Sequence, residues 1–455
     1  MNAWNSYLEV KPLPSLSGKA RVPSSKPETQ RAILAASLAS GRSIVHNDLR
    51  CLETETMKNA CRVIGATILE HDGYLEIHGI DGQLRTAHRS INALGSGLVF
   101  RVFAALTSFS GSASIITGDA TLRGRVMAPL FDALRKLGAS IECMGEDGCA
   151  PIVNWGGGFS GGECRLPGNV SSQFVTAILF AAPFAEYGVT IFIEGEILSV
   201  SYITQTIATL RNAGINVVHS EDYSKITVQP GSYKPTTSWI FGDYTSSSYL
   251  IGAASLFEGT TVLENMSKES LQGERAIVDV VKKMGVKVHF DEKEKSLTIN
   301  NPSGTLVGNF EFDASDYPNI VPTLAAIGAH VDGVFRVVGG AITRLHKSPR
   351  IKAMITELGK FGVDIVPLMK DGVYDGFEIR GRGKRFKGGL VLSSWGDHRI
   401  FMSLFVASLT CENPNLLEGH RDVICSFPDF FEQFGALGVA TREVEGFETR
   451  DAEFA

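Results

Sequence analysis

The sequence predicts an α/β protein in which one structural unit is repeated six times. The first observation is a recurring pattern of an apolar helical face, a glycine and a β-branched run, as in residues 57–68 with Gly65. An amphipathic helix that ends at a glycine and leads into a strand explains this pattern. The glycine returns every 71 to 77 residues, at Gly138, Gly214, Gly285, Gly362 and Gly438. A fixed period of this kind indicates internal repeats.

A second kind of helix supports the same interpretation. Turns of small residues open very apolar helices that lead into further strands, at 171–185, 246–257, 318–330 and 397–409. Each unit therefore carries two helices and several strands. Six units fill the chain with almost no linker.

Composition limits the classes of function. A length of 455 residues predicts two or three domains with sizeable cores. The net charge of −6 is mild, which argues against nucleic acid or an anionic membrane as partner, so a cationic site must be a local cluster. No apolar run is long enough to cross a bilayer, and the first residues lack the pattern of a signal peptide. Seven cysteines without metal-ligand spacing favour a reduced, cytoplasmic protein. The ten histidines show no ligand spacing either, so we expect no metal, and we expect no other cofactor.

The first candidate site is a helix start at residues 24–31. Ser24 and Ser25 are candidates for capping the helix, Lys26 precedes it and Arg31 lies in its early turns. Unpaired backbone N–H groups and a positive dipole make such a start attractive to anions. An ordinary capped helix with solvated charges is the alternative at this point.

The segment 22–31 resembles the opening Pro-Gly-Ser-Lys-Ser motif of 5-enolpyruvylshikimate-3-phosphate (EPSP) synthases, in which an arginine follows the lysine by five residues. These enzymes belong to the enolpyruvyl transferase family, as do the UDP-N-acetylglucosamine enolpyruvyl transferases. Here Ser24 replaces the family's glycine and Pro27 its second serine. The resemblance implies that Lys26 and Arg31 bind the substrate and that Lys26 also takes part in catalysis.

Two glycine-containing turns resemble the parts of this family that bind phosphoenolpyruvate. Gly97 lies in the turn Gly95-Ser96-Gly97, although the family has an asparagine in place of the first glycine. Arg125 falls on the family's phosphate-binding arginine, in the segment 118–130. The resemblance assigns both residues to phosphoenolpyruvate.

Polar residues at two further helix starts resemble the family's site for shikimate 3-phosphate. Ser171, Ser172 and Gln173 supply uncharged donors for a phosphate and a ring hydroxyl. Ser199 and Tyr202 follow at the family's Ser-x-x-Tyr spacing. Without the resemblance, the Ser-Ser-Gln turn could equally be a plain helix cap.

The segment 242–249 resembles a Gly-Asp-x-Ser-Ser turn close to the point where the family's chain returns to its first domain. This implies one domain of residues 1–21 plus 241–455 and an inserted domain of residues 22–240. Each would be an inside-out α/β barrel of three βαβαββ-type repeats. The active site would lie in the cleft between the domains and close around its ligands.

Two arginines in the second half match the family's clamp for the carboxylate of phosphoenolpyruvate. Arg350 lies in 344–351, and Arg399 follows Gly-Asp-His at 396–398. A bidentate guanidinium suits a carboxylate. We interpret His398 as a support of its turn.

Three of the family's acid–base positions are replaced. Asn319 stands for an aspartate that engages the attacking hydroxyl, Lys347 for a glutamate and Cys425 for a lysine. An amide can bond the hydroxyl but cannot take its proton. Asp316 and His346 are candidate substitutes, whereas the Cys425 thiol could act as an acid or nucleophile or be an inert filler.

The resemblance implies that a monomeric enzyme transfers the carboxyvinyl group of phosphoenolpyruvate to a hydroxyl of shikimate 3-phosphate or a closely related phosphorylated cyclohexene carboxylate. Its partners would be these anionic small molecules. Because the replaced residues handled protons, two other functions stay open. The pocket could eliminate phosphate from the cyclohexene, or it could bind ligands without catalysis.

Overall fold

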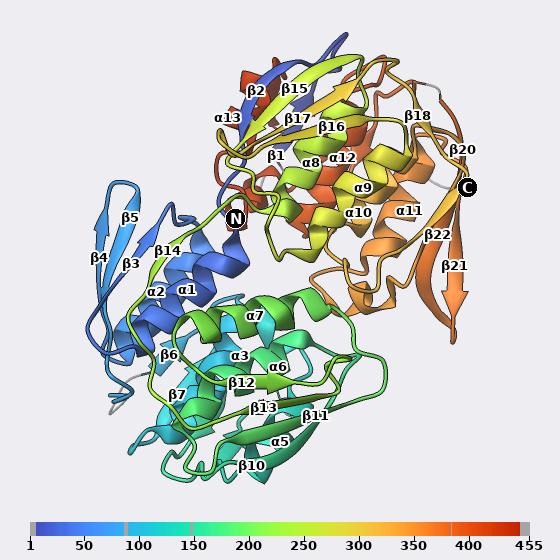
Figure 1. Ribbon diagram of the computed structural model, residues 1–455. Helices are drawn as coiled ribbons and strands as arrows, with labels where there is room; N and C mark the ends of the chain where they lie inside the picture. Colours follow the sequence, from blue (N-terminus) through green and yellow to red (C-terminus); the bar gives the residue numbers. More distant parts are fainter. Residues whose placement is uncertain (1–5, 86–89, 146–148, 384, 446–455) are drawn as a thin grey trace. The chain divides into compact units, whose positions relative to one another are not determined.

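The computed structural model describes residues 6–85, 90–145, 149–383 and 385–445 (Figure 1). Contacts along the chain divide it into two compact units. Unit 1 contains Met1–Pro23, Tyr244–Lys268 and Glu274–Ala455, and unit 2 contains Ser24–Asp243 and Glu269–Gly273. Within the described ranges, no helix is both long and apolar enough to span a membrane.

Unit 2 has three four-stranded sheets, ordered β14-β3-β5-β4, β6-β7-β9-β8 and β10-β11-β13-β12. The strands of these three sheets are β3 (Arg42–His46), β4 (Thr67–His71), β5 (Tyr74–His78), β6 (Ser90–Asn92), β7 (Ser114–Thr117), β8 (Ile141–Cys143), β9 (Ile152–Asn154), β10 (Gly162–Pro167), β11 (Val189–Glu194), β12 (Val217–His219), β13 (Lys225–Val228) and β14 (Thr237–Trp239).

Unit 1 also has three sheets, ordered β2-β15-β17-β16, β18-β20-β22-β21 and β23-β24-β1-β25, and β19 pairs with β20 beside β18. The strands of these three sheets are β1 (Ser6–Val10), β2 (Gly18–Arg21), β15 (Gly259–Glu264), β16 (Lys287–Asp291), β17 (Ser296–Asn301), β18 (Leu306–Val307), β19 (Phe310–Asp313), β20 (Val331–Val338), β21 (Ile365–Lys370), β22 (Val373–Arg382), β23 (Val391–Leu392), β24 (Asn415–Glu418) and β25 (Thr441–Glu445).

All six sheets have the same strand pattern. The first strand is parallel to the second, and the second, third and fourth strands pair antiparallel. The six repeat glycines precede the fourth strands and have φ between 80° and 115°, a conformation in which a side chain is strained. The structure thus confirms the predicted six-unit α/β architecture.

Each unit buries three apolar helices and covers them with three amphipathic ones. The buried helices are α1 (Lys26–Leu38), α3 (Gly97–Leu106) and α6 (Ser172–Ala181) in unit 2, and α8 (Tyr244–Ser255), α10 (Val321–Gly328) and α12 (His398–Ser408) in unit 1. The amphipathic helices are α2 (Leu52–Val63), α5 (Ala128–Lys136), α7 (Val200–Asn212), α9 (Ala276–Lys283), α11 (Arg350–Lys360) and α13 (Phe430–Ala436). Every residue of α3, α8, α10 and α12 is buried, as expected for helices without an exposed polar face. The small-residue turns predicted from the sequence lie at the starts of these buried helices.

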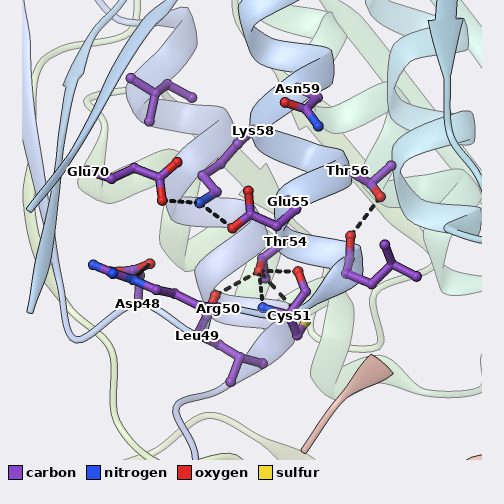
Figure 2. A network of polar contacts seen from close by, with 12 residues as sticks. Asp48, Leu49, Arg50, Cys51, Thr54, Glu55, Thr56, Lys58, Asn59 and Glu70 are labelled. Atoms are coloured by element: carbon purple, nitrogen blue, oxygen red, sulfur yellow. Dashed lines mark hydrogen bonds and ion pairs between the residues drawn. The ribbon is translucent and has the colours of Figure 1, made fainter. Parts of the chain in front are cut away.

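A polar network fixes the start of α2 and its contact with β4 (Figure 2). The buried Lys58 ammonium lies 2.7 Å from Glu70 Oε2 and also contacts Glu55, while Arg62 contacts Glu70 at 2.9 Å. The Thr54 hydroxyl accepts from the Cys51 N–H at 3.0 Å, which satisfies a donor at the helix start. A buried ammonium persists because it is paired, so we interpret this network as scaffold.

Candidate active-site residues

Lys26 begins α1, the first buried helix of unit 2. The Ser25 hydroxyl caps this helix by accepting from the Glu28 N–H at 3.4 Å. The Lys26 N–H donates to Asp243 Oδ2 at 3.2 Å, and the Lys26 ammonium lies 3.1 Å from Glu53 Oε1. Lys26 is thus held by carboxylates at both its backbone and its side chain.

Arg31 joins α1 to α7 through its guanidinium. Its Nε donates to Thr206 Oγ1 at 2.9 Å, and its Nη2 donates to the Tyr202 carbonyl at 3.3 Å. The guanidinium carbon also lies 5.9 Å from the centre of the Tyr202 ring. Burial lowers the pKa of Arg31 to about 10, partly offset by Tyr202 and Glu28, so the group is still a cation at neutral pH. The structure therefore brings two predicted site residues, Arg31 and Tyr202, together.

Gly97 lies where two guanidinium groups and an amide meet. A Cβ at this position would lie 2.7 Å from Arg101 Nη1, 3.0 Å from Arg125 Nη1 and 3.2 Å from Gln173 Oε1. Arg101 Nη1 also donates to Gln173 Oε1. Burial, and then the neighbouring charge of Arg125, lower the pKa of Arg101 to about 9. Two close cations with an amide form a site suited to an anion, and only glycine leaves the space open.

The remaining predicted site residues of unit 2 lie at the starts of α6 and α7. Ser171 caps α6 by accepting from the Gln173 N–H at 3.3 Å, and Ser172 is the first residue of that helix. Ser199 precedes α7 with φ of 59°, a left-handed conformation that costs a serine about 1–3 kcal/mol. Its carbonyl accepts from the Tyr202 N–H at 3.1 Å. Backbone strain of this kind favours a functional hypothesis for Ser199.

Arg350 is the centre of the polar cluster in unit 1. This buried guanidinium donates through Nε to Asp397 Oδ2 at 2.8 Å and through Nη1 to Asn319 Oδ1 at 3.1 Å. Its Nη1 also lies 2.9 Å from His346 Nδ1. Because arginine can only donate, His346 Nδ1 must accept, so the neutral ring carries its proton on Nε2.

Asp397 anchors both predicted carboxylate-binding arginines. Its Oδ1 accepts from the Arg399 N–H at 2.9 Å, and its Oδ2 accepts from the Ser348 hydroxyl at 3.2 Å as well as from Arg350. Burial would raise the pKa of Asp397, but Arg350 and His398 outweigh it and hold the pKa well below its usual range. Asp397 is therefore a fixed anion that orients the Arg350 guanidinium and caps the start of α12 at the Arg399 N–H.

Asn319 contacts a carboxylate that the sequence analysis missed. Its Nδ2 donates to Glu274 Oε1 at 3.1 Å, and Glu274 is only 1% exposed. Glu274 is the middle residue of the 3-10 helix Gly273–Arg275 and lies 45 residues before Asn319 in the sequence. No recognised motif contains it, so only the folded structure shows this contact.

The other predicted catalytic residues of unit 1 are Lys347, Cys425 and Asp316. Lys347 is half-buried between His346 and Ser348, both of which contact the cluster. Cys425 is half-buried at the end of the 3-10 helix His420–Cys425. Asp316 lies in the turn that leads from β19 to α10.

The fold and the buried arginines define a two-unit α/β protein equipped for anionic small molecules. A family model described as EPSP synthase (3-phosphoshikimate 1-carboxyvinyltransferase) matches residues 10–434. The 3-phosphoshikimate 1-carboxyvinyltransferase of Methanosphaera stadtmanae is 32% identical over 434 residues, 93% of this chain and 98% of that protein. The enzyme of the same name from Methanococcus maripaludis strain C5 is 33% identical over 435 residues, 95% of this chain and 98% of that protein.

A solved structure agrees with these relatives. EPSP synthase from Acinetobacter baumannii has a TM-score of 0.83 and 26% identity, with 97% of this chain and 100% of that chain covered. The chain belongs to the EPSP synthase family. It is an enzyme of the carboxyvinyltransferase class, and the expected inside-out two-domain α/β fold is confirmed.

Proposed function

We propose that the protein transfers the carboxyvinyl group of phosphoenolpyruvate to a hydroxyl of shikimate 3-phosphate. The observation that carries the proposal is the cluster of Gly97, Arg101, Arg125 and Gln173, because it combines two cations and an amide around a position without a side chain. The names of the relatives, 3-phosphoshikimate 1-carboxyvinyltransferase, support the same reaction.

Residues of unit 2 receive the substrate roles in this proposal. Shikimate 3-phosphate binds to side chains at the starts of α1, α6 and α7, namely Lys26, Arg31, Ser171, Ser172, Gln173, Ser199 and Tyr202. Hydroxyl and amide donors at helix starts are suited to a phosphate ester and ring hydroxyls. Asn319 of unit 1 bonds the attacking hydroxyl.

Phosphoenolpyruvate is assigned to the arginines. Arg125 binds its phosphate beside Gly97, where Arg101 adds a second cation. Arg350 and Arg399 bind the carboxylate. Because Asp397 accepts from the Arg350 guanidinium, that side chain needs little reorganisation when the ligand arrives.

Proton handling in this proposal requires titratable side chains. Lys26, Asp316, His346, Lys347 and Cys425 are the candidates among the predicted residues. His346 has its Nδ1 engaged by Arg350, so the neutral ring can donate a proton only from Nε2.

The test is steady-state release of inorganic phosphate with each substrate omitted in turn. We expect release only when shikimate 3-phosphate and phosphoenolpyruvate are both present. Arg125→Gln should raise the KM for phosphoenolpyruvate about tenfold or more, because a hydrogen bond between charged groups is worth about 1.5–3 kcal/mol. Arg123→Gln is the matched control, since its exposed side chain donates to the Gly118 carbonyl in the same turn. Equal effects of the two variants would contradict the assignment of Arg125.

Elimination of phosphate from the cyclohexene is the second candidate function. It is favoured by the replacement of three family acid–base positions with Asn319, Lys347 and Cys425, because a leaving phosphate needs cationic stabilisation more than it needs those groups. Release of phosphate from shikimate 3-phosphate alone would establish this reaction and exclude carboxyvinyl transfer as the main activity.

The proposal also includes a monomer that works in the cytoplasm. No disulfide is formed by the cysteines in the described ranges, which agrees with a reducing compartment. Light scattering coupled to gel filtration should give the mass of one chain. A dimer mass would contradict this part of the proposal.

A further inference from the structure

We infer that Glu274 is the general base that takes the proton of the attacking hydroxyl. The inference rests on the proposed carboxyvinyl transfer, and it names a residue for a role that the replacement of an aspartate by Asn319 leaves open. The attacking hydroxyl must lose its proton, and an amide cannot accept it. A carboxylate is therefore needed near Asn319.

Glu274 is that carboxylate. It is buried, and its Oε1 lies 3.1 Å from Asn319 Nδ2. The opposite end of the same amide accepts from Arg350 Nη1 at 3.1 Å. These two contacts fix the orientation of the amide, with its oxygen toward the cation and its nitrogen toward the carboxylate. Asn319 thus joins Arg350 to Glu274 by two hydrogen bonds.

In this arrangement the carboxylate lies at Glu274, one hydrogen bond away from position 319, where the family has its aspartate. An aspartate at position 319 would accept from Arg350 in the same way, but it would lie against the Glu274 carboxylate and repel it. With an amide at position 319 the repulsion becomes a hydrogen bond. A hydroxyl bonded to Asn319 is therefore within reach of Glu274, directly or through one water molecule.

The other charged or ionisable groups of the cluster are less suited to this role. Asp397 accepts from Arg350, Ser348 and the Arg399 N–H, and its strong preference for the charged form makes it a weak base. His346 Nδ1 already accepts from Arg350. Arginine is always protonated. Glu274 is therefore the remaining carboxylate of this cluster. Its hydrogen bond from Asn319 places it next to a hydroxyl that Asn319 binds.

The step balances without a further reactant. The hydroxyl O–H bond breaks as its oxygen forms a bond to C2 of phosphoenolpyruvate, and the proton passes to the Glu274 carboxylate. The bond from C2 to the phosphate oxygen breaks, and inorganic phosphate leaves with the electron pair. Glu274 then gives its proton to the released phosphate or to water.

The main test is Glu274→Gln, which keeps the size and one hydrogen-bonding oxygen of the side chain. We expect kcat to fall about 10²–10⁴-fold, whereas the Kd for shikimate 3-phosphate, measured by calorimetry, should change less than about threefold. Glu294→Gln is the matched control on an exposed turn of unit 1 and should keep wild-type kcat. A kcat of Glu274→Gln within threefold of wild type would overturn the inference.

A swapped variant tests whether the site needs a carboxylate on one side of the contact between positions 274 and 319. Glu274→Gln combined with Asn319→Asp keeps one carboxylate and one amide but returns the carboxylate to position 319. We expect this double variant to recover at least tenfold in kcat over Glu274→Gln. A folded double variant whose kcat stays 10²-fold or more below that of the wild type would overturn the inference, and this comparison with wild type can be made even if Glu274→Gln alone does not fold.

The outcomes also separate this inference from the proposed function. If the wild-type enzyme releases no phosphate from the two substrates, the proposed function fails and the inference fails with it. If the wild-type enzyme is active and Glu274→Gln is equally active, carboxyvinyl transfer stands and only the assignment of the base is wrong.

Discussion

Glu28 in the first turn of α1 is a carboxylate with an unfavourable environment. Burial raises the pKa of Glu28 from the ordinary value of 4.5 to about 7; a hydrogen bond from Gln272 opposes the shift and nearby Asp243 adds to it. The Gln272 amide donates to Glu28 Oε1 at 3.1 Å and to the Gly242 carbonyl at 3.0 Å. This single side chain therefore makes the stability of unit 2 depend on pH.

The sign of the effect follows from proton binding. Between pH 4.5 and about 7 the folded state binds more protons at Glu28 than the unfolded state, so the free energy of unfolding falls as pH rises through this window. Glu28→Gln removes the titration. Relative to wild type, the variant should gain about 1–3 kcal/mol on going from pH 5.5 to pH 8.5. Denaturant unfolding at both pH values measures this gain, and a difference that does not change with pH would contradict the shifted pKa.

At the scale of elements, the buried helices pack closely because small residues lie at their contacts. A Cβ on Gly252 of α8 would lie 3.0 Å from Ile327 Cγ2 of α10 and 3.7 Å from Val406 Cγ1 of α12. In contrast, Gly359 of α11 has no atom within 4 Å of the same position. A side chain at position 252 would thus meet a filled core, whereas a side chain at position 359 would meet open space.

Substitution of these glycines should give opposite results. Gly252→Leu should lower the free energy of unfolding by about 1–3 kcal/mol, because extra methylene groups overpack a filled core. Gly359→Ala should raise it by about 0.5–1 kcal/mol through helix propensity. Thermal unfolding of both variants measures the effect, and a Gly252→Leu variant as stable as wild type would show that the helices do not pack this tightly.

The elements also show what the sequence could predict. Each repeat glycine lies where one helix ends before one strand. This feature depends only on residues that are neighbours in the sequence, so the pattern could predict all six units. The partners of β2 and β14 are not local. β2 pairs with β15, and β14 pairs with β3, across more than 190 residues each. Composition and periodicity carry no information on such pairing. The resemblance to a family predicted only that the chain returns to its first domain near residue 241, not which strands pair.

In the candidate site, too, features set by neighbouring residues could be predicted, and contacts between distant residues could not. The helix-start residues Ser25, Ser171 and Asp397 cap their helices through side chains, a local role readable from the sequence. Glu274 could not be predicted, because its relation to Asn319 exists only where a turn and a helix start 45 residues apart come together. Contacts of this kind depend on tertiary packing.

At the scale of the whole molecule, one sheet of each unit is completed by a strand that is distant in the sequence from the other strands of that sheet. β1 lies between β24 and β25, so the first described strand completes the last sheet of unit 1. β14 likewise completes the first sheet of unit 2 after the chain has built the other two. The two units carry different proposed tasks, with the cationic cluster at Gly97 in unit 2 and the Arg350 cluster in unit 1.

The central claim is that the protein moves a carboxyvinyl group and releases phosphate from phosphoenolpyruvate. Phosphorus NMR of the wild-type enzyme with both substrates tests it most directly, because the phosphorus atoms of the two substrates have separate signals. We expect the phosphoenolpyruvate signal to decline as inorganic phosphate appears, while the ring phosphate persists as an ester with a shifted signal. Inorganic phosphate formed at the expense of the shikimate 3-phosphate signal, with phosphoenolpyruvate unchanged, would contradict the account.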